Sequence, residues 1–206
     1  NGLVELLQNP HRLDQQLINQ AFVAQSDRLF VLASELPYNN DLSLRPGAFS
    51  ELIAALKRQF HYIVIDLHQR GGALVDEAFD ASAMIHIVAD LSVHSTREAA
   101  RLCQFAETRD ASPALTVLVN ECRQPVPGRV NAKDFTDALA RGSVHSLPYE
   151  PQALALSENL GEAVSTQRSA FGAAIVSLAN SITGNQVAAE PERAEHRRPR
   201  REAARE

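Results

Sequence analysis

Five short segments of the chain consist mainly of apolar residues and have the length of buried β-strands. They are residues 28–33, 62–66, 84–89, 115–120 and, with a weaker pattern, 143–147. Apolar and polar residues do not alternate along these segments, which indicates strands whose two faces are both covered. The pattern therefore predicts a sheet that lies between layers of helices.

Segments with the apolar period of an amphipathic helix lie between and after these strands. The predicted helices cover residues 49–60, begin at Ser95, begin near Asn131, and cover residues 165–181. Ser95 and Glu98 have the spacing of a capping box, in which each side chain satisfies a backbone amide of the other residue. Gly184 can end the last helix. Strands that alternate with helices predict an α/β fold with a mostly parallel sheet and helices on both faces.

The length of 206 residues is enough for one hydrophobic core, and the apolar and charged fractions are ordinary for a globular protein. We expect one domain over residues 1–184. The net charge of −5 provides no general attraction to nucleic acid, so no such partner is expected. No apolar run reaches the roughly 18 residues that a membrane span needs. The chain begins without methionine and with residues typical of a domain interior, so we interpret it as a fragment.

Residues 185–206 have a different composition, with six Arg, five Glu and two Pro. Such a segment cannot bury enough apolar surface to fold, so it is predicted to be disordered. Its glutamates cancel most of the field of the arginines, which favours a solvated tail over contact with an acidic partner or lipid head groups. Arg97, Arg101 and Arg109 are likewise interpreted as solvated surface rather than as a docking face.

The cysteines and histidines show no metal-type spacing. Cys103 and Cys122 lie in apolar patterns, which is typical of reduced, buried thiols in a cytosolic protein. His68 is interpreted as an exposed loop residue, because no Ser or Cys nucleophile has a matching context. His86 lies in an apolar strand, which favours a hydrogen-bonded core or interface histidine over a ligand.

One apolar strand ends in an acidic residue, in the stretch FHYIVIDLHQRGG over residues 60–72. In an open α/β sheet, ligands bind beyond the carboxyl ends of the strands. A carboxylate at that place can hold Mg²⁺ through a water molecule while the ion bridges phosphate oxygens. Asp66 is therefore the candidate metal ligand. The alternative is that Asp66 only caps the helix that follows.

Two later strand ends carry candidate contacts to a nucleotide base. Asn120 ends the segment LTVLVN, and its amide offers both a donor and an acceptor to an adenine edge. Pro148 and Tyr149 follow the last strand in the segment SLPYE, where backbone beside a proline can form the wall of a base pocket. The alternatives are an asparagine that only makes a turn and a proline that only ends a strand.

The order of these segments resembles that of the ParA/MinD group of deviant-Walker P-loop ATPases. In detail it is most similar to the Flp/Tad pilus-assembly ATPases of the CpaE and TadZ type. The matching segments are GLVELLQNPHRLDQQLI, DRLFVLASELP, FHYIVIDLHQR and the VN and LPYE segments, over residues 2–183. The resemblance implies that Asp66 is the Walker B carboxylate, that Asn120 contacts adenine, and that Pro148 and Tyr149 form part of the base pocket.

The resemblance also implies cofactors, partners and a location. The cofactors would be ATP and Mg²⁺, and the protein would form a homodimer that depends on nucleotide. Its partners would be the pilus secretion ATPase and the polar assembly machinery. Its place would be cytoplasmic, at the cell pole or, through peripheral association, at the inner membrane face.

The sequence departs from this family in several places. The 206 residues contain no G-x-x-x-x-G-K-[ST] phosphate loop, and the only lysines, Lys57 and Lys133, lie on predicted helices. We therefore expect the N-terminal strand and phosphate loop of the family to be missing, and this chain alone not to hydrolyse ATP. After Asp66 the family's Leu-Pro-Arg is replaced by LHQR, and Asn120 is followed by Glu121 instead of arginine.

These departures keep a second interpretation open, in which the chain is a non-enzymatic scaffold or localisation protein of the same fold. Such a protein would keep its dimer and partner surfaces but bind little or no nucleotide. A receiver-like module is the least favoured interpretation, because the first predicted strand does not end in an acidic pair.

Overall fold

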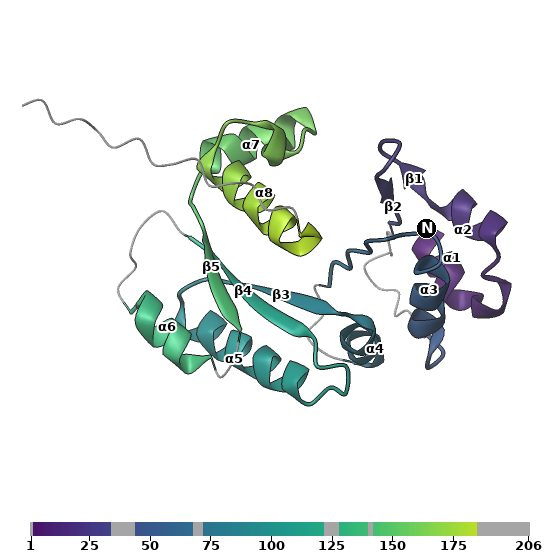
Figure 1. The fold of residues 1–206 in the computed structure, drawn as a ribbon, viewed down its shortest axis with the longest axis horizontal. Coiled ribbons are helices and arrows are strands. Elements are labelled where there is room, and N and C mark those ends of the chain that lie inside the picture. The colour runs from purple at the N-terminus through teal and green to yellow at the C-terminus, as the bar shows by residue number, and fades with distance from the viewer. Residues whose placement is uncertain (1, 34–43, 68–71, 122–127, 140–141, 185–206) are drawn as a thin grey trace, which may run out of the picture. The chain divides into compact units, whose positions relative to one another are not determined.

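The computed structural model describes residues 2–33, 44–67, 72–121, 128–139 and 142–184. The chain divides into two compact units, Asn1–His145 and Ser146–Glu206 (Figure 1). The predicted tail, as well as Cys122 and His68, lies outside the described residues. Within the described ranges, no helix is both long enough and apolar enough to cross a membrane.

The first unit begins with helices and a short hairpin and continues into the main sheet. Its first elements are α1 (Gly2–Gln8), a 3-10 turn (Pro10–Arg12), α2 (Gln15–Ala21), β1 (Val23–Ala24), β2 (Phe30–Val31) and α3 (Ala48–Leu56). They are followed by α4 (Ala73–Ala81), β3 (Met84–Ala89), α5 (Val93–Glu107), β4 (Ala114–Asn120) and α6 (Ala132–Ala138). The last strand, β5 (Ser143–Leu147), begins in the first unit and ends in the second.

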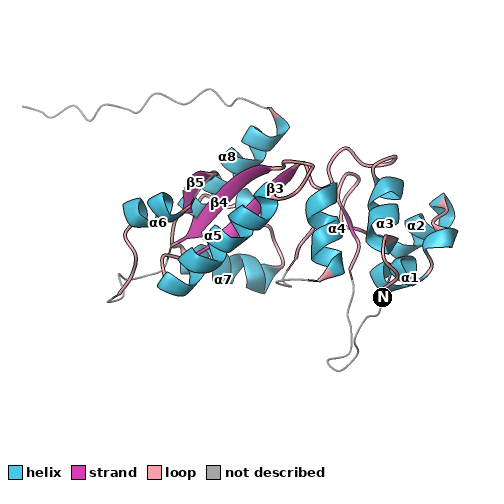
Figure 2. Ribbon diagram, turned by 90° about the horizontal axis from the view of Figure 1, so that it is seen from below, coloured by secondary structure: helices cyan, strands magenta, loops and turns pink. Residues whose placement is uncertain are grey.

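The main sheet has the strand order β3–β4–β5. β3 and β4 are parallel, with Met84 opposite Ala114 and Ala89 opposite Val119. Both strands are rich in Val, Ile and Leu, whose shapes suit a pleated and largely buried surface. Figure 2 shows α5 running along this sheet. These elements confirm the predicted α/β fold with a parallel sheet that is flanked by helices.

One face of the sheet forms one of the hydrophobic cores of the first unit. Ile87 and Val117 point to this face and pack with Cys103 of α5 and Phe135 of α6. Burial raises the pKa of the Cys103 thiol, with a smaller contribution from the charge of Glu107. The prediction that Cys103 is a buried free thiol is therefore confirmed.

Burial alternates along β3, although its apolar run indicates continuous burial. Met84 and Val88 are 39% and 64% exposed, whereas Ile87 and Ala89 are buried. Successive side chains of a strand point to opposite faces, and Ile87 and Ala89 lie on the face that packs with α5 and α6, whereas Met84 and Val88 lie on the other face.

The first predicted strand, residues 28–33, is only partly formed. Phe30 and Val31 pair in antiparallel fashion with Ala24 and Val23, so this segment belongs to a separate two-stranded hairpin. Three phenylalanines brace the hairpin: the ring of Phe60 lies 5.2 Å from that of Phe22 and 5.7 Å from that of Phe30.

The predicted strand at residues 62–66 has no hydrogen-bonded neighbour in the part of the chain that the structure describes. Its side chains nevertheless alternate as in a strand. Ile63 and Ile65 pack against the core around α1 and α3, while Tyr62 and Val64 are 60% and 94% exposed. The prediction of a β-strand here is wrong, because extended backbone forms a strand only when it is hydrogen-bonded to a neighbouring strand.

Two predicted helix starts differ from the structure, and one agrees. The predicted helix 49–60 is α3, which ends at Leu56 and begins after Gly47, whose φ of 83° favours glycine. α5 begins at Val93 rather than Ser95, because the hydroxyl of Ser92 accepts the hydrogen bond from the backbone N–H of Ser95. The predicted capping box is therefore wrong. Asn131 caps α6 as predicted.

The second unit contains α7 (Pro151–Leu160), a 3-10 turn (Val164–Thr166) and α8 (Ala170–Thr183). The predicted helix 165–181 is α8, which starts later because Ser169 caps it. The Glu150 carboxylate also accepts a hydrogen bond from the backbone N–H of Phe171, at 2.9 Å. Gly184 ends the helix as predicted.

Candidate functional site

The carboxyl ends of β3 and β4 lie at one edge of the sheet, because these strands are parallel and in register. Asp90 directly follows β3, and Asn120 ends β4. The register pairs Ala89 with Val119, so Asp90 and Asn120 occupy the next positions along the two strands. This is the edge at which open α/β sheets bind their ligands.

Asp66 lies in an exposed position at the end of the extended segment 62–67. Among the described residues, no hydrogen bond or ion pair to its carboxylate is present. The helix that follows, α4, has Gly72 at its N-cap and receives no side-chain cap. The alternative that Asp66 caps the next helix is therefore not what the structure shows. A solvated, uncommitted carboxylate is the chemistry that an Mg²⁺ site with water ligands requires.

Asn120 is also exposed and uncommitted. Within the described residues its side-chain amide makes no hydrogen bond, so it does not serve as a turn-forming asparagine there. Both the donor and the acceptor of the amide are thus free to meet the edge of a base. Pro148 and Tyr149 follow β5 and belong to the second unit, where Tyr149 is 42% exposed.

Asp90 is a residue that the motif search missed. Its carboxylate accepts a hydrogen bond from the backbone N–H of Ser92 at 2.7 Å, while its own N–H donates to the hydroxyl of Ser95 at 2.9 Å. Hydrogen bonds from Ser92 are the main reason that the pKa of Asp90 lies below its ordinary value. The sequence does contain a signal for this ordered turn. Asp90 directly follows the apolar strand, and two serines, Ser92 and Ser95, come three residues apart after it.

Neither lysine lies in a glycine-rich phosphate loop. The ammonium group of Lys57, at the end of α3, donates to the backbone carbonyl of Ala81 at 2.9 Å. Lys133 is exposed on α6. The described residues contain no glycine-rich cradle for the phosphates of a nucleotide, and the roles of Asp66 as a metal ligand and of Asn120 as a base contact stay predictions.

His86 is half-buried on β3, and its buried Nδ1 has no hydrogen-bond partner among the described residues. Burial first, and then the charge of His145, hold the pKa of His86 below its ordinary value of 6.5. Among the described residues, no group of three or more His, Cys, Asp or Glu side chains could hold a metal ion. That His86 is not a ligand stays a prediction. Nδ1 does not make the hydrogen bond expected of a core histidine, and an interface role for His86 stays a prediction.

The lowered pKa of His86 predicts a loss of stability in mild acid. The folded chain binds fewer protons than the unfolded chain, so the free energy of unfolding declines as the pH falls below 6.5. We expect His86→Val to reduce this slope, and the exposed His61→Gln to leave it unchanged. Urea denaturation between about pH 7 and pH 5 measures both. Equal slopes in wild type and His86→Val would contradict the prediction.

Comparison with known proteins was made from sequence and from structure. No model of a protein family matches the sequence, and no curated protein matches it either. Solved structures do match. A ParA family ATPase from Chlorobium tepidum superposes with a TM-score of 0.74 at 20% identity, over 86% of this chain and 73% of that chain. The MinD cell division protein of Aquifex aeolicus superposes with a TM-score of 0.65 at 20% identity, over 84% and 72%.

The chain has a ParA/MinD-like fold. A third structure, the MinC:MinD cell division complex of Aquifex aeolicus, matches with a TM-score of 0.55 at 19% identity, over 69% of this chain and 62% of that chain. The ParA/MinD-like fold agrees with the fold that the order of sequence motifs implied. At these identities the comparison establishes architecture, and the chemistry is argued from the residues themselves.

Proposed function

We propose that this chain is the nucleotide-switch domain of a pilus-assembly subunit of the Flp/Tad type, similar to CpaE and TadZ. It binds ATP and Mg²⁺ as a homodimer and helps to place or organise the secretion machinery. The observation that carries the proposal is the exposed carboxylate of Asp66, which forms no hydrogen bond or ion pair with the described residues and lies at the end of an extended segment in a ParA/MinD-like fold. The order of segments over residues 2–183 supports the pilus-assembly assignment.

Each functional residue has a distinct part in this proposal. Asp66 holds Mg²⁺ through water, Asn120 contacts the adenine edge, and Pro148 and Tyr149 form part of the base pocket. Bound Mg²⁺ supplies positive charge that neutralises phosphate oxygens. The residues of this chain orient the metal and the base, and without a phosphate loop they do not hydrolyse ATP by themselves.

The proposal includes partners and a place of action. Partners are the pilus secretion ATPase and the polar assembly machinery, and a complex between MinD and MinC among the similar structures supports a protein partner. The place of action is the cytoplasm, at the cell pole or at the inner membrane face, and no nucleic acid is involved.

A non-enzymatic scaffold of the same fold is the second candidate function. The positions of the two lysines favour this function. The ammonium group of Lys57 donates a hydrogen bond to the carbonyl of Ala81, and the other lysine, Lys133, lies on α6, so neither lies in a loop that could bind phosphate. In that case the fold keeps its partner surfaces while Asp66 and Asn120 no longer contact a ligand.

Calorimetric titration with Mg²⁺ and ATP separates the two functions. Residues 1–206 are expected to bind ATP with Mg²⁺, and to bind weakly because they contain no glycine-rich phosphate loop. Asp66→Asn is expected to weaken Mg²⁺-dependent binding about tenfold, because a neutral amide loses the charge that attracts the metal.

Asp137→Asn provides the matched control, since Asp137 is an exposed carboxylate on α6. Its affinity is expected to equal that of wild type. Wild-type affinity in Asp66→Asn would remove Asp66 from the metal site. No binding by residues 1–206 would leave the scaffold as the function.

A further inference from the structure

Helix α4 uses three acidic side chains within five positions to hold the elements on its two sides. Asp76 and Asp80 are four residues apart and so share one face of the helix, while Glu77 lies about a quarter turn away. Glu77 contacts the start of α3, whereas Asp76 and Asp80 contact the residues just after α5. The helix thus makes polar contacts to two elements that are distant in sequence.

Glu77 supplies the N-terminal cap that α3 lacks. The N-cap residue of α3, Gly47, has no side chain to cap it. The Glu77 carboxylate accepts hydrogen bonds from the backbone N–H of Gly47 at 2.7 Å, from the backbone N–H of Ser50 at 2.9 Å, and from the hydroxyl of Ser50 at 3.1 Å. A carboxylate at this end of α3 is also favoured by the helix dipole.

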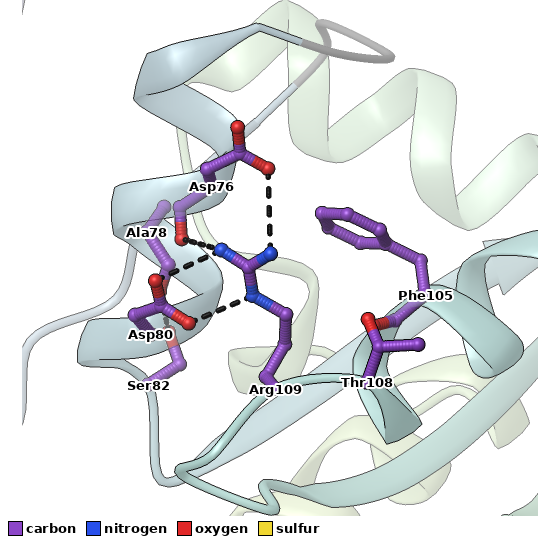
Figure 3. Close-up of polar contacts among 7 residues, drawn as sticks. All are labelled: Asp76, Ala78, Asp80, Ser82, Phe105, Thr108 and Arg109. Carbon is purple, nitrogen blue, oxygen red and sulfur yellow. Dashed lines mark hydrogen bonds and ion pairs between the residues drawn. The ribbon is translucent and has the colours of Figure 1, made fainter.

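Arg109 fastens the other face of α4, and Figure 3 shows its contacts. Its guanidinium donates to both carboxylate oxygens of Asp80, from Nε at 2.7 Å and from Nη2 at 2.8 Å. Nη1 lies 3.7 Å from a carboxylate oxygen of Asp76, and the guanidinium carbon lies 4.8 Å from the centre of the Phe105 ring. We call these four residues the Arg109 clamp.

The Arg109 side chain is held in one place by its contacts and is not a solvated surface arginine. The Arg109 side chain is only 19% exposed, which corrects the interpretation of this residue as solvated surface. Beneath it, the ring of Phe105 packs edge-on against Phe79 of α4, with 5.0 Å between ring centres. A bidentate guanidinium stacked on an aromatic ring fixes both orientation and distance.

α4 begins immediately after Gly72, a few residues beyond Asp66. Its buried side chains are divided between neighbours: Ala78 belongs to the core around α3, and Val75 and Phe79 pack with Ala106 of α5. The helix that follows Asp66 therefore packs against both α3 and α5.

We propose that α4 is a coupling element, in which the Arg109 clamp holds the helix where Glu77 can cap α3. Release of the clamp then loosens the start of α3, and release of the cap loosens the end of α5. Any displacement of the start of α4, which is the end nearer to Asp66, would therefore change the contacts of both α3 and α5. The coupling is a property of the folded chain and does not depend on the proposed binding of nucleotide.

Amide hydrogen exchange of the whole 206-residue chain tests the coupling. Arg109→Met keeps the apolar stem over Phe105 but removes the clamp. It is expected to speed exchange at the amides of Gly47 and Ser50 by about threefold or more beyond the change at β4 amides, which report global unfolding. Arg101→Met is the control, because Arg101 is exposed and, within the described part of the chain, its one ion pair is with Glu98 of its own helix.

The reverse experiment follows from thermodynamic reciprocity. Glu77→Gln is expected to speed exchange at the amides of Thr108 and Arg109, again relative to β4. This second variant decides the question if Arg109→Met does not fold. Changes at Gly47 and Ser50, or at Thr108 and Arg109, that only match those of β4 would show two independent local contacts and overturn the proposal.

Discussion

Replacement of Phe135 by alanine is expected to lower the free energy of unfolding by about 3–5 kcal/mol. Phe135 is fully buried on α6 and packs in the cluster that joins the sheet to α5. Truncation removes the apolar area of the ring and leaves a cavity that the neighbouring strands cannot fill without losing their own ladder. Urea denaturation, followed by circular dichroism, measures the loss as a shift in midpoint at unchanged slope.

Leu29→Ala is the control for this prediction. Leu29 is 57% exposed beside the β1–β2 hairpin, and its truncation is expected to change the free energy of unfolding by no more than about 0.5 kcal/mol. Similar losses in the two variants would mean that the cluster around Phe135 is not the core of the first unit.

The strands of the main sheet were the most predictable part of the fold. The segments 84–89 and 115–120 correspond to β3 and β4, with one additional residue at the start of β4. Each is a run of residues with high β-propensity, and each has a parallel partner and a helix to cover it. The apolar pattern of these segments and their surroundings in the fold both favour a strand, so the pattern alone was sufficient to predict β3 and β4.

The segments 28–33 and 62–66 show where such prediction fails. Both have the composition of strands, but composition does not specify a partner. Residues 30–31 pair with a hairpin neighbour instead of the main sheet, and residues 62–66 pair with none of the described strands. The cap of α5 failed for a related reason, because Ser92 and Ser95 are both suitable cap residues and Glu98 pairs with Arg101 instead.

The sequence indicates which residues are candidates for the site, but it does not show whether the fold itself uses their side chains. Sequence placed Asp66 and Asn120 at strand ends, yet only the structure shows that neither side chain is used by the fold among the described residues. The acidic residues of α4 gave no signal, because the partners of Glu77 and Asp80 lie 27 to 30 positions away in the chain. Contacts between residues that are so far apart in the chain leave no pattern in the local sequence from which they could be predicted.

Replacement of Glu77 by alanine is expected to lower the free energy of unfolding by about 2 kcal/mol. The start of α3 would lose three hydrogen bonds, two of them from backbone N–H groups that have no other cap. Denaturation at neutral pH measures the loss. Glu158→Ala is the control, since Glu158 is exposed on α7 and its side chain caps no helix in the described residues.

The same contact predicts a pH dependence of known sign. Burial alone would raise the pKa of Glu77, but hydrogen bonds from Gly47 and Ser50 outweigh it and hold the pKa below its ordinary value of 4.5. The stabilisation is therefore complete above pH 4.5 and disappears as the pH falls through the lower folded-state value. The difference between wild type and Glu77→Ala should shrink in that window. A difference that stays constant would mean that the carboxylate charge does not stabilise α3, and that the loss in Glu77→Ala comes from packing alone.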